Sequence, residues 1–210
     1  VGRRTLALRF AQALNCPNPI EPGVPCGTCR TCRQIETMQQ ADLHVVQAEI
    51  EGGILKVENI RDLQHELSLT PYESKYHVAL LLRFEEANEN TQNALLKTLE
   101  EPNPRVVILA TAENTEKLLP TIVSRCEVLR LRPVAPSILT EALRKRGVEE
   151  QQADLLAHVA GGRPGAALRM LVDPTFMEKR RQYLDDLVEL ERSSLRDRFA
   201  YAERITRYKN

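Results

Sequence analysis

The segment HVALLLRFEEANENTQNALLKTLEEPNPRVVILA, residues 77–110, decides the fold of this chain. Residues 77–82 and residues 105–110 are almost entirely apolar runs of the length of a buried β-strand. Between them, residues 90–99 place leucines three and four positions apart, on one face of an expected helix. Strands that are apolar on both faces and joined by a helix are typical of a parallel sheet covered by helices.

The same alternation extends beyond this segment in both directions. Further strands are expected at residues 42–48 and 127–131, and further helices at residues 4–14, 57–67 and 115–124. The helix at residues 90–99 has Asn90 as its expected cap and Pro102 just beyond its end. The sequence therefore predicts an α/β fold with a parallel sheet flanked by helices.

Composition excludes several classes of protein. The 210 residues contain 29 Lys+Arg and 29 Asp+Glu, so no net charge would attract the chain to nucleic acid or an anionic membrane. With four Phe, five Tyr and no Trp, an aromatic platform for stacking bases is not expected. No apolar run is long enough for a transmembrane helix or a signal peptide, so we expect a cytoplasmic protein. Because the chain begins with Val1 rather than Met, it also looks cut from a longer protein.

The character of the sequence changes after Pro133 and Pro136. From here on only helices are expected, separated by Gly147, the Gly161-Gly162 pair and Pro174. Their expected ranges are residues 137–146, 149–160, 164–171 and 175–208. The sequence therefore predicts a second, all-helical unit.

Four of the five cysteines form a cluster with the spacing C-x9-C-x2-C-x2-C: Cys16, Cys26, Cys29 and Cys32. Two-residue gaps allow successive thiolates to face one tetrahedral centre, and four soft thiolates suit Zn²⁺. Disulfides are the alternative, but the last three cysteines are too close together for separate good bridges. We predict a closed, structural zinc module at about residues 15–34. Cys126 is expected to be a small buried apolar residue, and the four histidines, His44, His65, His77 and His158, show no ligand spacing.

Three segments match one known family. They are Asn93–Pro102 (NALLKTLEEP), Ile108–Ala112 (ILATA) and Leu119–Cys126 (LPTIVSRC). Together with the four cysteines, they resemble the bacterial clamp-loader subunits of the AAA+ class, namely the gamma/tau and delta-prime subunits of DNA polymerase III. The resemblance runs in order from about residue 1 to about residue 172.

The resemblance implies a domain organisation. It predicts an AAA+ α/β domain with a P-loop-like sheet over residues 1–134, including the inserted zinc module. A small helical lid domain is expected over residues 135–174, and residues 175–210 would begin a helical collar or a linker helix.

The resemblance also indicates where an active member would hold its nucleotide. Aligned on Gly2, Arg3 takes the place of the phosphate-binding Lys and Arg4 that of the Ser/Thr that binds Mg²⁺, with Thr5 one residue late. The phosphate loop is therefore degenerate, and we expect that this chain does not bind ATP.

The acidic pair that would orient Mg²⁺ and polarise water is missing at its expected positions, which hold Leu82 and Arg83. Glu85 and Glu86 come three residues later and would point elsewhere unless the register shifts. No intrinsic ATPase activity is expected.

Three other residues match functional positions of the family. The resemblance implies that Arg125 is an arginine finger acting on a neighbouring subunit's ATP, although an ordinary salt-bridged arginine is the alternative. Thr111 matches a sensor of the γ-phosphate, or caps a strand end. Arg163 lies near the lid-domain sensor region, where a helix-start turn explains Gly162 and Pro164 equally well.

These matches favour a non-hydrolysing subunit of the delta-prime type, with structural zinc as its cofactor. Its implied partners are the gamma/tau and delta subunits and, through the assembly, the sliding clamp and primer–template DNA, with no membrane. An active gamma/tau-type ATPase is one alternative. A zinc-module nucleic-acid-binding protein is another. Arg30 and Arg33 are the only nearby basic residues on the C-terminal side of the cysteine cluster, too few for strong phosphate binding.

Charge is divided unevenly along the neutral chain. Residues 85–101 hold five acids against one lysine, and residues 125–146 hold six bases against two acids. Glu100 and Glu101 end the expected helix, where the helix dipole disfavours anions by a few tenths of a kcal/mol. Helix stability alone would not select them, although a solvated helix end is the alternative.

Overall fold

The computed structural model describes residues 2–207. These residues form two compact units, Gly2–Leu131 and a helical unit that begins at Arg132. The first unit contains a parallel sheet in the order β1-β2-β3, formed by β1 (Leu43–Val46), β2 (His77–Leu81) and β3 (Val106–Ala110). The predicted α/β class with a parallel sheet is therefore confirmed.

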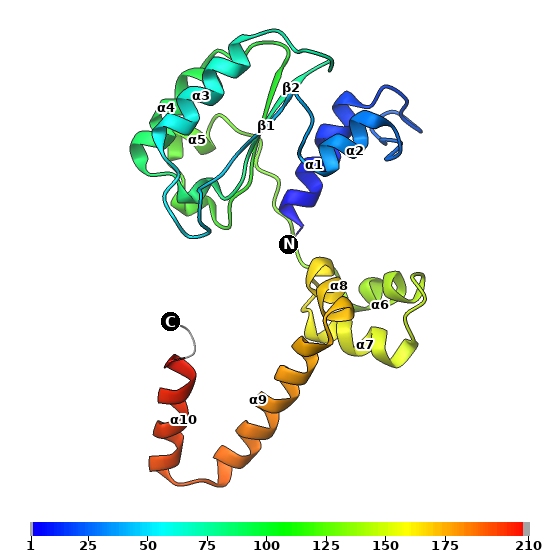
Figure 1. Ribbon diagram of the computed structural model, residues 1–210, viewed down its shortest axis with the longest axis vertical. Helices are drawn as coiled ribbons and strands as arrows, with labels where there is room; N and C mark the ends of the chain where they lie inside the picture. Colours follow the sequence, from blue (N-terminus) through cyan, green and yellow to red (C-terminus); the bar gives the residue numbers. More distant parts are fainter. Residues whose placement is uncertain (1, 208–210) are drawn as a thin grey trace. The chain divides into compact units, whose positions relative to one another are not determined.

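Helices cover both faces of this sheet (Figure 1). On one face lie α1 (Arg3–Asn15) and α2 (Arg30–Glu36), and on the other lie α3 (Val57–Ser68), α4 (Glu89–Glu100) and α5 (Pro120–Val123). Because side chains alternate along β2, Val78 and Leu80 pack with the first pair of helices, and Ala79 and Leu81 with the second group. Full burial on both faces explains why β2 reads as a continuous apolar run.

Two details of the helices differ from the sequence prediction. The cap of α4 is Asn88, whose side chain accepts a hydrogen bond from the Thr91 amide at 2.9 Å, so the expectation that Asn90 caps this helix is wrong. The helix expected at residues 115–124 is two short pieces, a 3₁₀ turn at Thr115–Lys117 and α5. Pro120 explains the break, because the residue before a proline is driven away from helical geometry.

The strand expected at residues 127–131 is not formed. Within the described residues, β3 is hydrogen-bonded to β2 alone. Leu129 is 69% exposed and Leu131 is 39% exposed, so these apolar side chains do not join the core. The prediction failed because strand-like composition does not supply a neighbouring strand to pair with.

The second unit contains α6 (Pro136–Arg144), α7 (Glu150–Val159) and α8 (Pro164–Val172) around a core of leucines, alanines and Met170. Gly162 has φ +70°, and a Cβ there would collide with the carbonyl oxygen of Val134, while the Val134 amide donates to the Gly162 carbonyl at 2.8 Å. The second glycine of the predicted separator is thus required by a close backbone approach.

The long helix expected at residues 175–208 is two helices, α9 (Pro174–Arg192) and α10 (Leu195–Arg207). Ser193 has extended geometry, and the Ser194 hydroxyl accepts from the Asp197 amide at 3.4 Å, which starts a new helix. Tyr208 lies outside the described residues. Over residues 2–207, no helix combines the length and hydropathy needed to cross a bilayer.

Candidate functional site

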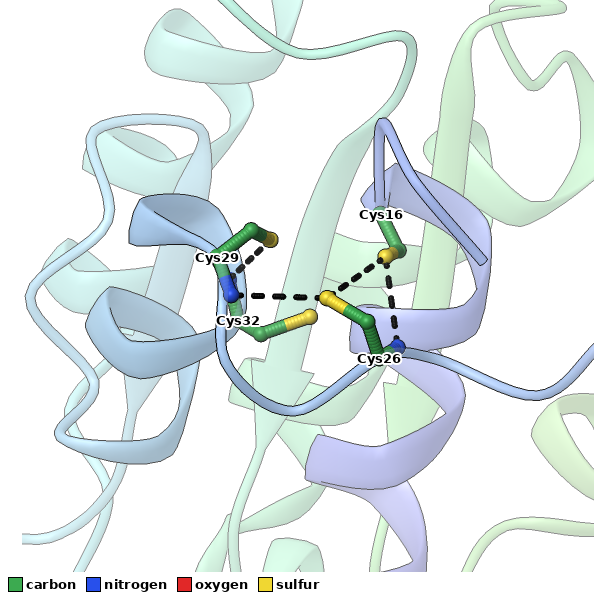
Figure 2. A group of neighbouring side chains, drawn as sticks. All are labelled: Cys16, Cys26, Cys29 and Cys32. Carbon is green, nitrogen blue, oxygen red and sulfur yellow. Dashed lines mark hydrogen bonds between the residues drawn. The ribbon is translucent and has the colours of Figure 1, made fainter. Parts of the chain in front are cut away.

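The four clustered cysteines meet at the junction of α1 and α2 (Figure 2). Cys16 follows the last residue of α1, Cys29 caps the start of α2, Cys32 lies in the first turn of α2, and Cys26 lies in the connecting loop. Their four sulfur atoms all lie within 4.8 Å of one another. Among the described residues, no other group of three or more His, Cys, Asp or Glu comes this close together.

The sulfur spacing fits a metal site and not a set of disulfides. Tetrahedral coordination with Zn–S bonds of about 2.3 Å places the sulfurs about 3.8 Å apart. The Sγ atoms of Cys16 and Cys26 are 3.6 Å apart, whereas a disulfide needs about 2.05 Å. All five cysteines are free thiols. The cluster is therefore compatible with a structural zinc ion held by four thiolates.

Backbone amides are already directed at these sulfurs. The amides of Cys26, Cys29 and Cys32 donate to the sulfurs of Cys16, Cys26 and Cys29 at 3.5, 3.4 and 3.4 Å. Gly27 allows this turn with φ +70°. Amide donation from Cys29 and Thr28 lowers the pKa of Cys26 to about 6, whereas burial raises the pKa of Cys32 to about 12. A bound cation would draw all four sulfurs into the thiolate form.

Buried amide side chains tie this module to the sheet domain. Gln12 Nε2 donates to the Cys32 carbonyl at 2.7 Å, and Gln12 is almost fully buried. Asn15 exchanges two hydrogen bonds of 3.0 Å with the backbone of Tyr76, directly before β2. The cysteine cluster is thus held in a fixed position at one end of α1.

Arg3, at the expected phosphate-binding position, is paired with groups of the protein itself. Its Nη1 donates to the Ala112 carbonyl at 2.6 Å, and its Nη2 lies 3.2 Å from the Glu113 carboxylate. The Glu113 amide in turn donates to Glu85 Oε1 at 3.0 Å. Gly2, Arg4 and Thr5, the rest of the degenerate loop, are exposed at the start of α1. The Arg3 guanidinium group is therefore paired within the protein.

The two positions of the missing acidic pair are occupied by groups with structural contacts. Leu82 is buried in the core, and Arg83 adopts the left-handed conformation with φ 50°. Arg83 Nε lies 2.8 Å from Glu86 Oε1, which also accepts from the Gly52 amide at 2.9 Å. Glu85 and Glu86 lie in a 3₁₀ turn, Phe84–Glu86.

Thr111 connects the carboxyl ends of β2 and β3. Its hydroxyl accepts from the Arg83 amide at 3.0 Å and donates to the Leu81 carbonyl at 3.4 Å. These contacts give the side chain a role at the strand ends. Arg163 is the exposed residue before α8, which starts with Pro164, so local turn geometry accounts for that segment.

Arg125 lies just after α5, at the protein surface. Its Nη2 is 2.7 Å from Glu100 Oε1 at the end of α4, and its Nη1 donates to the Thr121 carbonyl at 3.0 Å. The neighbouring Cys126 is exposed, so the expectation of a buried residue is wrong. The thiol follows the end of a four-residue helix in a surface turn and does not reach the core.

The structure also brings together three polar side chains that sequence reasoning missed, namely Asp42, His44 and His77, of which Asp42 and His77 are buried. His44 Nε2 and His77 Nδ1 are 3.1 Å apart, and His77 Nδ1 is 3.8 Å from Asp42 Oδ1. Burial and the neighbouring His77 lower the pKa of His44. The parallel register of β1 and β2 sets this proximity, because it pairs Leu43 with Val78. Spacing along the sequence gives no signal for it.

A family model described as "DNA polymerase III, delta subunit" matches residues 1–135. The Bacillus subtilis "DNA polymerase III subunit delta'" is 35% identical over 159 residues, 75% of this chain and 47% of that protein. The Haemophilus influenzae protein of the same name is 32% identical over 185 residues, 88% of this chain and 55% of that protein.

The similarity also extends to another type of subunit. The Escherichia coli "DNA polymerase III subunit tau" is 36% identical over 132 residues, 63% of this chain and 20% of that protein. The chain spans about half the length of the delta' relatives it matches. With the family model covering well over half of its residues, this chain belongs to the DNA polymerase III delta subunit family of bacterial clamp-loader subunits.

Proposed function

We propose that this chain is part of a non-hydrolysing delta'-type subunit of the replicative clamp loader. In this proposal it completes a ring of AAA+ subunits with gamma/tau and delta partners in the cytoplasm, and the assembly places the sliding clamp on primed DNA. A structural zinc ion would hold the cysteine module.

The observation that carries the proposal is the ion pairing at the carboxyl ends of the strands. Arg3 pairs with Glu113, and Arg83 occupies an acidic position and pairs with Glu86. Mg²⁺ binding needs a hydroxyl, where the resemblance aligns Arg4, and hydrolysis needs a carboxylate to orient the metal and water, where it aligns Leu82 and Arg83. The residues here do not fit a bound Mg²⁺–ATP, so we derive no hydrolytic step in this subunit.

Arg125 gives the subunit its proposed role in a neighbour's ATP site. It lies at the surface on a short helix end, held by one carboxylate and one carbonyl. An arginine supplied in trans stabilises the charge that spreads over the transferred phosphoryl group, and this contributes about 10³–10⁵-fold in rate.

Reconstitution of the loader tests this role. With Arg125→Ala in the full-length subunit, turnover at the adjacent ATP site should fall on the order of 10³-fold, while Arg130→Ala, another exposed arginine nearby, should leave it unchanged. Unchanged ATPase and clamp loading with Arg125→Ala would exclude the finger.

Calorimetric titration of the subunit with ATP and Mg²⁺ tests the other half of the proposal. The similarity to tau supports an active ATPase as the second candidate. That candidate requires ATP binding and hydrolysis by this subunit, whereas the proposal requires neither.

A further inference from the structure

Glu100 and Arg125 join two of the three segments that carry the family resemblance. Glu100 is the last residue of α4, in the segment Asn93–Pro102, and Arg125 lies in the segment Leu119–Cys126. Their charged atoms are 2.7 Å apart, the length of a strong charge-assisted hydrogen bond. Each of these two segments therefore contributes one half of a single ion pair.

The position of Glu100 has no explanation from helix stability. A carboxylate at a helix C-terminus faces the negative end of the dipole, which costs a few tenths of a kcal/mol. Arg125 supplies the opposite charge at that point. The acid is thus explained by its partner and not by the helix that contains it.

We propose that Glu100 is a positioning residue that holds Arg125 at rest and releases it when a neighbouring subunit presents an ATP phosphate. This inference rests on the finger role proposed above. The phosphate is the stronger anion, and it takes the place of the Glu100 carboxylate on the same guanidinium group.

The exposure of the pair suits such an exchange. The side chain of Arg125 is 36% exposed and that of Glu100 is 50% exposed. Exposed pairs contribute only about 0.2–1 kcal/mol, so the resting contact can orient the arginine without preventing its transfer. The second contact, from Nη1 to the Thr121 carbonyl, keeps the side chain near the surface of α5.

Glu100→Gln in the reconstituted loader tests the proposal. Removing the competing carboxylate should raise the loader's basal ATPase, measured without clamp or DNA at subsaturating ATP, by about two- to five-fold. The gain should appear as a lower KM with unchanged kcat, because only the arginine's availability changes. It should shrink as salt rises from about 0.05 to 0.3 M, since salt screens the pair in the parent protein.

Glu101→Gln is the matched control, because it removes the same charge from the next residue at the same helix end. This variant should not raise the basal ATPase, and it shows how much of any change comes only from removing a negative charge at the helix C-terminus. The double variant Glu100→Gln with Arg125→Ala should behave like Arg125→Ala alone, because no finger remains to be released.

The outcomes separate this inference from the proposed function. If Arg125→Ala lowers ATPase but Glu100→Gln has no effect, lowers activity, or matches Glu101→Gln, the resting contact is wrong and the finger remains. If Arg125→Ala itself has no effect, the proposed function fails first.

Discussion

The cysteine module and the carboxyl ends of the strands hold their polar groups in different ways. In the module, backbone amides are directed at the sulfurs, and Cys32 is fully buried. At the strand ends, flexible side chains pair with each other, as Arg3 does with the largely exposed Glu113. Backbone donors are fixed by the fold, whereas exposed ion pairs can exchange their partners at little cost.

This difference indicates which polar groups the fold holds in a fixed position. The four cysteine sulfurs converge from the end of α1, a loop and α2, and this geometry is compatible with a bound metal ion. At the carboxyl ends of the strands, cations and carboxylates of the protein neutralise one another. The largest effects of substitution should therefore fall in the backbone-held groups.

Loss of a zinc ligand should have the largest effect. We expect metal analysis to find about one Zn per chain, and Cys29→Ser or a strong chelator should remove it and lower the stability by about 3 kcal/mol or more. The thermal midpoint and zinc content should fall together.

Cys126→Ser is the control, because this thiol is exposed and outside the cluster. It should change neither value. Purified protein without zinc and with disulfides among the four cysteines would contradict the interpretation of the module.

Asp42 tests the same principle without a metal, at the amino ends of the strands. Its buried carboxylate accepts hydrogen bonds from the amides of Tyr72, Glu73 and Ser74 at 2.6, 3.0 and 2.8 Å. Burial opposes its ionisation, but these donors and Gln40 outweigh burial and lower its pKa to about 2. Asp42→Asn should cost about 2 kcal/mol at neutral pH.

The pH dependence follows from the sign of this shift. Because the pKa is lower in the folded state, Asp42 stabilises the protein above the unfolded pKa of about 3.9. That contribution is lost as the pH falls through about 2. Denaturant titrations between pH 5 and pH 2 should show a shallower decline for Asp42→Asn than for the parent, and equal slopes would rule out this role.

Most of the sheet domain could be predicted from sequence because its elements have local signals. The apolar runs at β2 and β3, the leucine face of α4 and the cysteine spacing each report a structure that neighbouring residues determine. The strand expected at residues 127–131 failed because a strand also needs a partner, which its own sequence does not specify.

The contacts of the candidate site depended on long-range pairing and could not be predicted. Arg3 meets Glu113 across 110 positions of sequence, and His44 meets His77 through the register of two strands. The sequence indicated that Glu100 was misplaced for helix stability, but only the structure supplies Arg125 as its partner. Local sequence patterns therefore identified Glu100 as unfavourable at a helix end, and its ion pair with Arg125 in the fold explains its presence there.

The Arg83–Glu86 pair should show an intermediate effect. The Glu86 side chain is only 10% exposed and also accepts from the Gly52 amide, so it combines a side-chain pair with a backbone donor. Glu86→Gln should cost about 1–2 kcal/mol, measured by urea unfolding. The exposed neighbour Glu51, changed to Gln, should cost less than about 0.5 kcal/mol, and equal losses in the two variants would show that the pair is not structural.

The Arg3–Glu113 pair should show the smallest effect on stability, because the Glu113 side chain is 68% exposed and water screens the pair. Glu113→Gln should change the free energy of unfolding by less than about 0.5 kcal/mol and leave calorimetric titration with Mg²⁺–ATP without a signal. The substitution would leave the Arg3 cation available to a phosphate. Arg4, Leu82 and Arg83 would still stand where the resemblance places the Ser/Thr hydroxyl and the two acids that bind Mg²⁺ and water. Micromolar ATP binding by Glu113→Gln would instead mean that this carboxylate alone blocks a competent site, and the contrast between the two regions would then rest on a single side chain.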